Sequence, residues 1–190
     1  MLQTALHFSH TLLQEVIQEG DTVVDATMGN GNDTAFLAQL VGSTGLVYAF
    51  DVQEQALINT EKKLTESDLI NQARLNHKGH ETIDTTLPEK TQLSAAVFNL
   101  GYLPKSDKQI ITKPYTTKKA LDALLPRLAP KGRIIVVVYY GHLGGEAELA
   151  LIQNYCQELP QENYSVLTYQ FINQKNNPPI LFCIEKKAKS

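Results

Sequence analysis

Hydrophobic residues follow two different spacings along this chain. Runs rich in β-branched and apolar residues predict strands at 22–27, 45–52, 73–78, 94–100 and 132–140. Stretches with apolar residues three or four positions apart predict helices before the first strand and between most of the later ones. Because strands that alternate with helices pair in parallel, this pattern predicts a parallel sheet with helices on both faces.

The last two predicted strands depart from the alternation. Residues 164–172 and 179–187 have no helix between them, so we expect them to pair antiparallel. The predicted fold class is therefore α/β, with a Rossmann-like, seven-stranded, mostly parallel sheet, a C-terminal antiparallel hairpin and one domain over residues 1–190. The strand at 132–140 is the most hydrophobic, which predicts a central place in the sheet.

Local signals predict where the helices begin and end. The first helix should end at Gly20, with an apolar face made of Leu6, Leu12, Leu13, Val16 and Ile17. Asp33 or Thr34 is expected to cap the second helix. Pro126 predicts a kink or a 3₁₀ turn at the end of a later helix.

Composition narrows the class of protein. A hydrophobic content of 43%, a charged content of 19% and a net charge of −3 are typical of a globular protein and argue against a general binder of polyanions. We expect no membrane span, because no apolar run approaches about 18 residues, and a cytoplasmic location, because the start lacks a secretory signal. The spacing of His77, His80 and Glu81 is not that of a zinc protease, so no metal is expected. The sequence leaves open whether two copies of the chain form a homodimer.

All five predicted parallel strands end in polar or glycine-rich residues. The segments that follow them are DATMGNGNDT, FDVQ, NHKGHE, NLGYLP and YYGHLGG. One such end explains no more than a turn, but ligands of parallel sheets bind outside the carboxyl ends of the strands. Five polar ends at one edge therefore predict a binding site.

Charge indicates which ligand the first of these segments binds. Gly29 and Gly31 only partly match the dinucleotide fingerprint, because Thr34 holds its third glycine position. Asp25, Asp33 and Asp51 are expected to surround the glycine-rich turn, and we call these three residues the acidic corner. No Lys or Arg lies between Asp21 and Asp51. A pyrophosphate would be repelled there, whereas an ammonium and a sulfonium beside a neutral adenosine would fit. The corner thus favours S-adenosylmethionine.

Two further strand ends supply candidate contacts for that cofactor. Asp51 ends the second strand, where an acid can accept hydrogen bonds from ribose hydroxyls. His80 and Glu81 follow the third strand, near the expected position of the adenine. An exposed helix cap and a polar surface turn are the simpler alternatives for these positions.

The stretch FNLGYLP ends the fourth strand in a way that packing alone does not require. The Asn99 side-chain oxygen and the Leu100 carbonyl can accept hydrogen bonds from an amino group, and Tyr102 can pack on a planar base. Here the sequence resembles amino-methyltransferases, whose tetrapeptide is (D/N)PP(Y/F). Asn99-Leu100-Gly101-Tyr102 keeps its first and last residues but not its prolines.

The five strand-end motifs also occur in the same order in a small bacterial family labelled rRNA methylases. Over essentially its whole length the chain is similar to the MnmM-type tRNA enzymes, which methylate the amine of 5-aminomethyl-2-thiouridine at the wobble position. This resemblance implies a class I methyltransferase fold, S-adenosylmethionine as cofactor and a tRNA anticodon stem-loop as partner. It also implies cofactor contacts from Asn30, Asn32, Asp33, Asp51, Gln53, His80 and Glu81, beside Asp25, Gly29 and Gly31 of the acidic corner.

Methylation of an amine also requires the loss of a proton. His142 and Tyr140, after the fifth strand, are candidates to take it, although an incidental His in a glycine-bounded turn explains them equally well. The alternative functions are methylation of rRNA or of a small amine, a nicotinamide-dependent oxidoreductase, and an RNA-binding module without activity.

A lysine-rich segment follows the fourth strand directly. Residues 105–119 hold five lysines against Asp107, a local charge of +4 in a chain whose total is −3. The residues expected to bind RNA are Lys105, Lys108, Lys113, Tyr115, Lys118 and Lys119. A solvated surface loop is the alternative.

Overall fold

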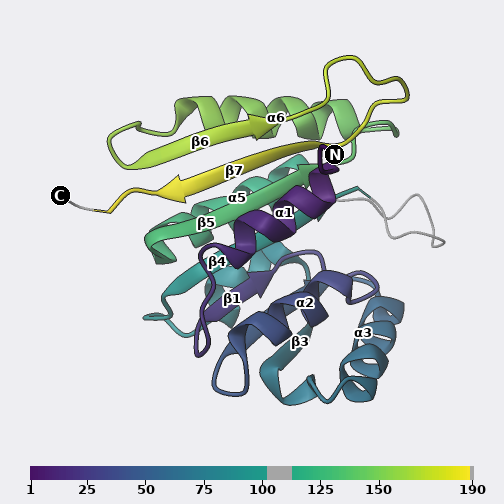
Figure 1. Cartoon of the computed structure of the whole chain (residues 1–190), viewed down its shortest axis with the longest axis vertical. Helices are drawn as coiled ribbons and strands as arrows, with labels where there is room; N and C mark the ends of the chain where they lie inside the picture. The colour runs from purple at the N-terminus through teal and green to yellow at the C-terminus, as the bar shows by residue number, and fades with distance from the viewer. Residues whose placement is uncertain (102–112, 189–190) are drawn as a thin grey trace.

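A computed structural model describes residues 1–101 and 113–188 of the chain. Its strands form one seven-stranded sheet in the order β3-β2-β1-β4-β5-β7-β6 (Figure 1). Neighbours pair in parallel except β7, which lies antiparallel to both β5 and β6. The mostly parallel sheet and its antiparallel hairpin are therefore confirmed. The strands are β1 Thr22–Asp25, β2 Leu46–Asp51, β3 Ala73–His77, β4 Leu93–Leu100, β5 Leu128–Val138, β6 Tyr164–Tyr169 and β7 Ile180–Lys186.

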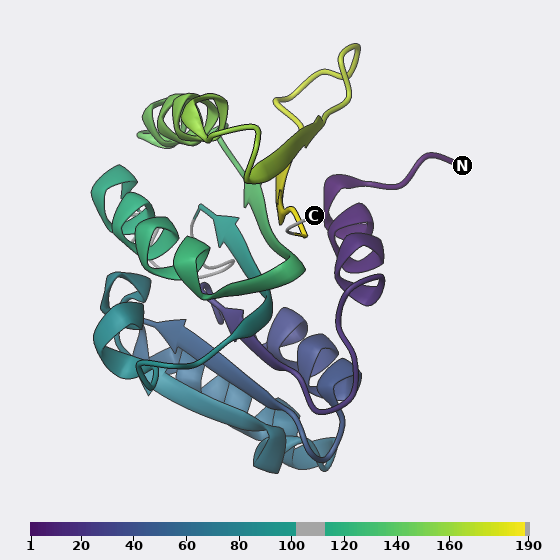
Figure 2. The ribbon, with the colours of Figure 1, turned by 90° about the vertical axis from the view of Figure 1, so that its left-hand side faces the viewer.

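Helices cover both faces of the sheet, as Figure 2 shows for α1 and α2 on one side and α5 and α6 on the other. Alternation along a strand assigns each face its own core: Val23, Val97 and Ile135 pack with α1, α2 and α3, while Val24, Phe98 and Val136 pack on the other face with α4, α5 and α6. The helices are α1 Ala5–Gln14, α2 Asn32–Val41, α3 Glu54–Glu66, α4 Ile83–Thr86, α5 Pro114–Leu124 and α6 Gly145–Glu158, with 3₁₀ turns η1 Ile70–Gln72, η2 His80–Thr82 and η3 Leu125–Arg127. The turn η3 confirms the prediction made from Pro126.

The first helix is shorter than its apolar spacing predicts. It ends at Gln14 rather than at Gly20, and Leu6 is exposed instead of packing on the sheet. The Asp21 carboxylate accepts a hydrogen bond from the Gln18 amide at 2.8 Å, and this local bond favours a turn over a continued helix. The apolar spacing thus persists beyond the helix that it indicates.

The most hydrophobic strand is not the middle one. The middle position belongs to β4, and β5 lies beside it between β4 and β7. Both strands are buried on both faces along their carboxyl-terminal halves. The hydrophobicity of a strand therefore indicates that both of its faces are buried, and does not indicate its position in the strand order.

Among the described residues, we find no helix that combines the length and the hydropathy needed to cross a membrane.

Candidate active site at the carboxyl edge of the sheet

The loop after β1 is tied to the ends of its two neighbouring strands. The Ala26 amide donates to the Val97 carbonyl of β4 at 2.9 Å, and the Met28 amide donates to the Phe50 carbonyl of β2 at 2.9 Å. The Asn99 amide donates to the Thr27 hydroxyl at 2.7 Å. These bonds bring the candidate residues of β1, β2 and β4 to one place.

The glycine-rich loop turns through two left-handed residues, Gly29 at φ +54° and Gly31 at φ +77°. A Cβ on Gly31 would lie 2.7 Å from the Thr60 hydroxyl oxygen and 2.9 Å from the Thr60 Cα of α3. The missing side chain at Gly31 therefore makes room for α3. Gly31 is also the N-cap of α2, whose first turn contains Asp33 and Thr34, so the prediction that one of these two caps the helix is wrong.

Asp51 holds this loop through both of its carboxylate oxygens. One accepts the Gly29 amide and the other the Gln53 amide, each at 2.9 Å. An ionised carboxylate can accept about four hydrogen bonds, so acceptor capacity is left for two ligand hydroxyls. Asp51 can thus fix the loop and bind a ribose at the same time.

Asp25 is fully buried at the end of β1. The Thr34 hydroxyl donates to its carboxyl at 2.6 Å and the Thr27 amide donates at 3.1 Å. Burial, followed by the nearby charge of Asp33, raises the pKa of Asp25 from 3.8 to about 7. Part of this rise is repulsion from Asp33, which a bound cation would offset.

Asp33 joins two residues that lie far apart in the sequence. One carboxylate oxygen lies 2.7 Å from His10 Nε2, and the other accepts a hydrogen bond from the Asn99 side-chain amide. The Asn99 Oδ1 atom is shielded from solvent and has no hydrogen-bond partner among the described residues. Asn99 therefore presents an unused acceptor beside the acidic corner.

Two loop asparagines contact α3. Asn59 donates to the Asn30 side-chain oxygen at 3.0 Å, and the Lys63 ammonium donates to that of Asn32. Lys63 thus places a cation beside the acidic corner, although the sequence from Asp21 to Asp51 contains no Lys or Arg. The contact of Asn30 and Asn32 with S-adenosylmethionine stays a prediction.

His80 is a buried residue that supports the end of β1. Its Nδ1 donates to the Ala26 carbonyl at 3.0 Å, and its ring meets Phe98 edge-on at a centroid distance of 5.5 Å. Burial lowers the pKa of His80, so the imidazole is neutral. Glu81 is half-buried and folds its carboxylate over Gly79. In the described residues no group of His, Cys, Asp and Glu is arranged to hold a metal ion.

Tyr139, which the sequence reasoning missed, follows β5 directly, and a Cβ on Gly101 would lie 3.3 Å from its Cβ. Burial, followed by the charge of Asp33, raises the pKa of Tyr139, which makes this tyrosine a further candidate beside the acidic corner. Tyr140 packs on the opposite side, against the core beneath α5 and α6. Alternation just beyond β5 explains this difference and favours Tyr139 over Tyr140 as a site residue. His142 lies in the turn before α6, where its carbonyl accepts the Gly145 amide.

The predicted RNA-binding segment is described only in its second half. Tyr102, Lys105 and Lys108 lie outside the described residues. The other four, Lys113, Tyr115, Lys118 and Lys119, are all exposed at the start of α5. Lys118 forms an ion pair with Asp122 at 2.7 Å, which neutralises part of the local charge.

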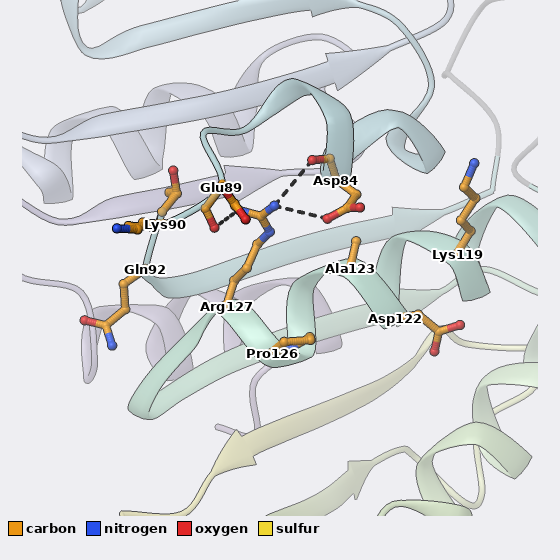
Figure 3. A pocket seen from close by; sticks show the side chains of 10 residues that line it. Asp84, Glu89, Lys90, Gln92, Lys119, Asp122, Ala123, Pro126 and Arg127 are labelled. Atoms are coloured by element: carbon orange, nitrogen blue, oxygen red, sulfur yellow. Dashed lines mark hydrogen bonds and ion pairs between the residues drawn. The ribbon is translucent and has the colours of Figure 1, made fainter.

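A cavity of about 660 Å³ lies elsewhere, between α5 and the loop that leads into β4 (Figure 3). Arg127 crosses its wall, donating to the Pro88 carbonyl at 2.7 Å and pairing with Asp84 at 3.1 Å. Its charged lining is balanced, with Asp84, Glu89 and Asp122 against Lys90, Lys119 and Arg127. This cavity is at the amino end of β4, away from the polar strand ends.

The fold and the polar edge together define the class, a Rossmann-like methyltransferase. The family described as "Putative rRNA methylase" matches residues 47–185, and the chain belongs to this family.

Close relatives of known structure share the whole fold. A crystal structure described as a "putative rRNA-methylase" from Clostridium thermocellum is 45% identical, with a TM-score of 0.95 over 98% of this chain and 99% of that one. A "putative methyltransferase" from Streptococcus mutans, solved in complex with SAH, is 43% identical, with a TM-score of 0.90 and the same coverage.

A curated relative carries a specific name. The chloroplastic tRNA (mnm(5)s(2)U34)-methyltransferase of Arabidopsis thaliana is 36% identical over 197 residues, which cover 96% of this chain and 70% of the relative.

Proposed function

We propose that this protein transfers a methyl group from S-adenosylmethionine to the amine of 5-aminomethyl-2-thiouridine at the wobble position of tRNA. The observation that carries the proposal is the unused, solvent-shielded Asn99 oxygen beside the acidic corner. The name of the Arabidopsis relative and the SAH bound to the Streptococcus mutans structure support the same reading.

The residues of the corner suit a cationic cofactor. Burial, then the charge of Asp33 and, to a smaller extent, that of Asp51 raise the pKa of Asp25, so these acids interact. A pyrophosphate would add to this repulsion, which argues against a nicotinamide dinucleotide. Asp51 would bind the ribose, and Asp25 with Asn30, Asn32, Gln53, His80 and Glu81 would bind the rest, while Asp33, bonded to Asn99, would lie between the cofactor and the amine.

When bound, S-adenosylmethionine supplies an electrophilic methyl group on a positively charged sulfur. Asn99 Oδ1 would accept a hydrogen bond from the substrate amine and so orient its lone pair. The Leu100 carbonyl already accepts the Tyr139 amide at 2.9 Å, and its second lone pair would accept another amine proton. Orientation of this kind can lower a barrier by roughly 7–11 kcal/mol.

The substrate amine must be neutral to react, but an alkylamine in water is mostly protonated at pH 7. It must therefore lose the ammonium proton before the transfer. The shielded surroundings of Asn99 Oδ1 favour the neutral amine through desolvation. The methylated amine would then release a proton to water. His142, in the turn after β5, is the candidate to accept that proton. Tyr140 is the weaker candidate because it packs away from Asp33.

The proposed partner is the anticodon stem-loop of tRNA, held by the exposed residues at the start of α5 and by the lysines that precede them. The proposed compartment is the cytoplasm, and a homodimer stays a prediction.

One assay tests this function. Purified protein is incubated with S-adenosylmethionine and tRNA that carries the aminomethyl group, and the nucleosides are analysed by mass spectrometry. We expect a gain of one methyl group at the wobble nucleoside, and no gain on tRNA that lacks the aminomethyl group. Asn99→Ala should lower the single-turnover rate by roughly 10²-fold while cofactor affinity stays within a few-fold. Methylation of rRNA or a free amine in place of tRNA would reject the substrate assignment, and wild-type turnover by the variant would reject the role of Asn99.

A further inference from the structure

We propose that His10 is a positioning residue of the methyl-transfer site, acting through Asp33 on the orientation of the Asn99 amide. This inference rests on the proposed function and assigns Asp33 to the amine side of the site. The contacts that carry it run from His10 Nε2 to one Asp33 oxygen at 2.7 Å, and from the other Asp33 oxygen to the Asn99 side-chain NH₂.

Asp33 determines which way the Asn99 amide faces. An ionised carboxylate only accepts hydrogen bonds, so the NH₂ of the amide must turn towards Asp33. The opposite orientation would place the amide oxygen against the carboxylate. Asn99 Oδ1 is thereby directed away from Asp33, which leaves it as the unused acceptor.

His10 in turn fixes the carboxylate. It reaches the site from α1, a helix outside the βα units, and its ring stacks on Phe36 of α2 with centroids 4.0 Å apart and an interplanar angle of 12°. Because the carboxylate cannot donate, Nε2 must carry the proton of the bond to Asp33. Asp33 is thus held on both oxygens and is almost fully buried, so it has little freedom to turn away from Asn99.

The arrangement also affects the charge on the Asn99 oxygen. During the transfer the new carbon–nitrogen bond forms as the carbon–sulfur bond breaks, and positive charge moves from the sulfur to the amine nitrogen. A carboxylate bonded to the NH₂ of an amide makes the amide oxygen more negative, which stabilises that developing charge. Loss of His10 should therefore lower the rate of transfer more than the affinity for either substrate.

Three variants test this role. His10→Phe keeps an aromatic ring for the stack on Phe36 but removes the donor to Asp33, and His10→Gln restores a neutral donor without the ring. His7→Phe is the matched control, because His7 lies exposed on the same helix and bonds to Thr4. We expect His10→Phe to lower kcat by about 10-fold with KM for tRNA and Kd for S-adenosylmethionine within 2-fold, His10→Gln to recover most of the rate, and His7→Phe to match the wild type.

A second measurement needs neither ligand nor activity. In ¹⁵N NMR spectra of the ligand-free protein, we expect the Asn99 side-chain NH₂ to exchange with solvent about 10-fold faster in His10→Phe than in the wild type, and His10→Gln to restore slow exchange. If the wild type methylates no tRNA, the proposed function fails while this measurement still decides the positioning role. Unchanged kcat and unchanged amide exchange in His10→Phe would overturn the inference. A loss of cofactor affinity as large as the loss of rate would also overturn it, because His10 would then act on the cofactor.

Discussion

At the scale of single residues, the buried carboxyl of Asp25 makes stability depend on pH. Its pKa is 3.8 in an unfolded chain and about 7 in the folded protein, raised by burial and then by Asp33. Between these values the folded state keeps a proton that the unfolded state has lost, so this group lowers stability as the pH rises from about 4 to about 7. Above pH 7 its full cost is present.

Asp25→Asn removes this titration. We expect a melting temperature about 3–6 °C above the wild type at pH 8 and a difference that shrinks as the pH falls towards 4, where the unfolded wild-type chain also takes up the proton. Thermal melts of both proteins across this range measure the difference, and the shared titration of His80 cancels from it. A constant difference at all pH values would show that Asp25 does not titrate near 7.

A second prediction at the scale of single residues concerns Asp51. Asp51→Ala should weaken the binding of S-adenosylmethionine by about 1.5–3 kcal/mol, the range for hydrogen bonds to a charged group. It should also lower the melting temperature, because the amides of Gly29 and Gln53 lose their acceptor. Calorimetry measures the first effect. Glu54→Ala, an exposed acid that begins α3, is the charge-matched control and should leave affinity within about 2-fold. Equal losses in the two variants would mean that only net charge matters.

The candidate residues at strand ends could be predicted from the sequence, because a polar residue that ends a buried strand has few structural explanations. Asp25, Asp51 and Asn99 are of this kind, and the structure brings them to one edge. His10 and Tyr139 could not be predicted in the same way. His10 comes from a helix that precedes the sheet, and only the tertiary fold brings it to Asp33. For Tyr139 the signal was present, since it alternates with Tyr140, but the direction of each ring depends on where β5 ends.

At the scale of elements, the glycine-rich loop connects β1 to α2 and packs against α3. Gly31→Ala should destabilise the protein by about 2–4 kcal/mol, because its Cβ would meet the Thr60 backbone and its φ of +77° strains any other residue. Gly141→Ala is the control, since its Cβ would lie 3.6 Å from Asn177, an ordinary contact. Chemical denaturation compares the two. Similar stability in both would show that α3 can shift away from the loop.

Element order and type could be predicted well, but helix ends could not. Hydrophobic spacing reports which residues are buried, and Leu13, Val16 and Ile17 all face the core whether the chain is helical or turning. The end of α1 depends instead on a hydrogen bond from the Gln18 amide to Asp21, which spacing does not encode. The start of α2 likewise depends on the left-handed conformation of Gly31, while Asp33 and Thr34 are used for contacts within the site.

At the scale of the whole molecule, charge is unevenly distributed along the chain. The chain carries a net charge of −3, and a segment of charge +4, residues 105–119, follows in the sequence soon after β4, which ends at the acidic corner. An RNA bound through this segment would meet local attraction although the protein as a whole repels it. If three to five phosphates are neutralised there, log affinity for an anticodon stem-loop should fall with log salt at a slope of about −2 to −4.

Lys118→Ala with Lys119→Ala tests whether α5 takes part in that contact. The double variant should flatten the slope by about 1–2 and weaken binding at low salt, since it also leaves Asp122 without its partner Lys118. Its affinity for S-adenosylmethionine should not change. Lys62→Ala with Lys90→Ala removes the same charge from exposed positions away from the carboxyl edge and should keep the wild-type slope. Filter binding over a salt series measures all three proteins. If both double variants lose the same amount, the attraction is a property of net charge, and the start of α5 is not part of the RNA site.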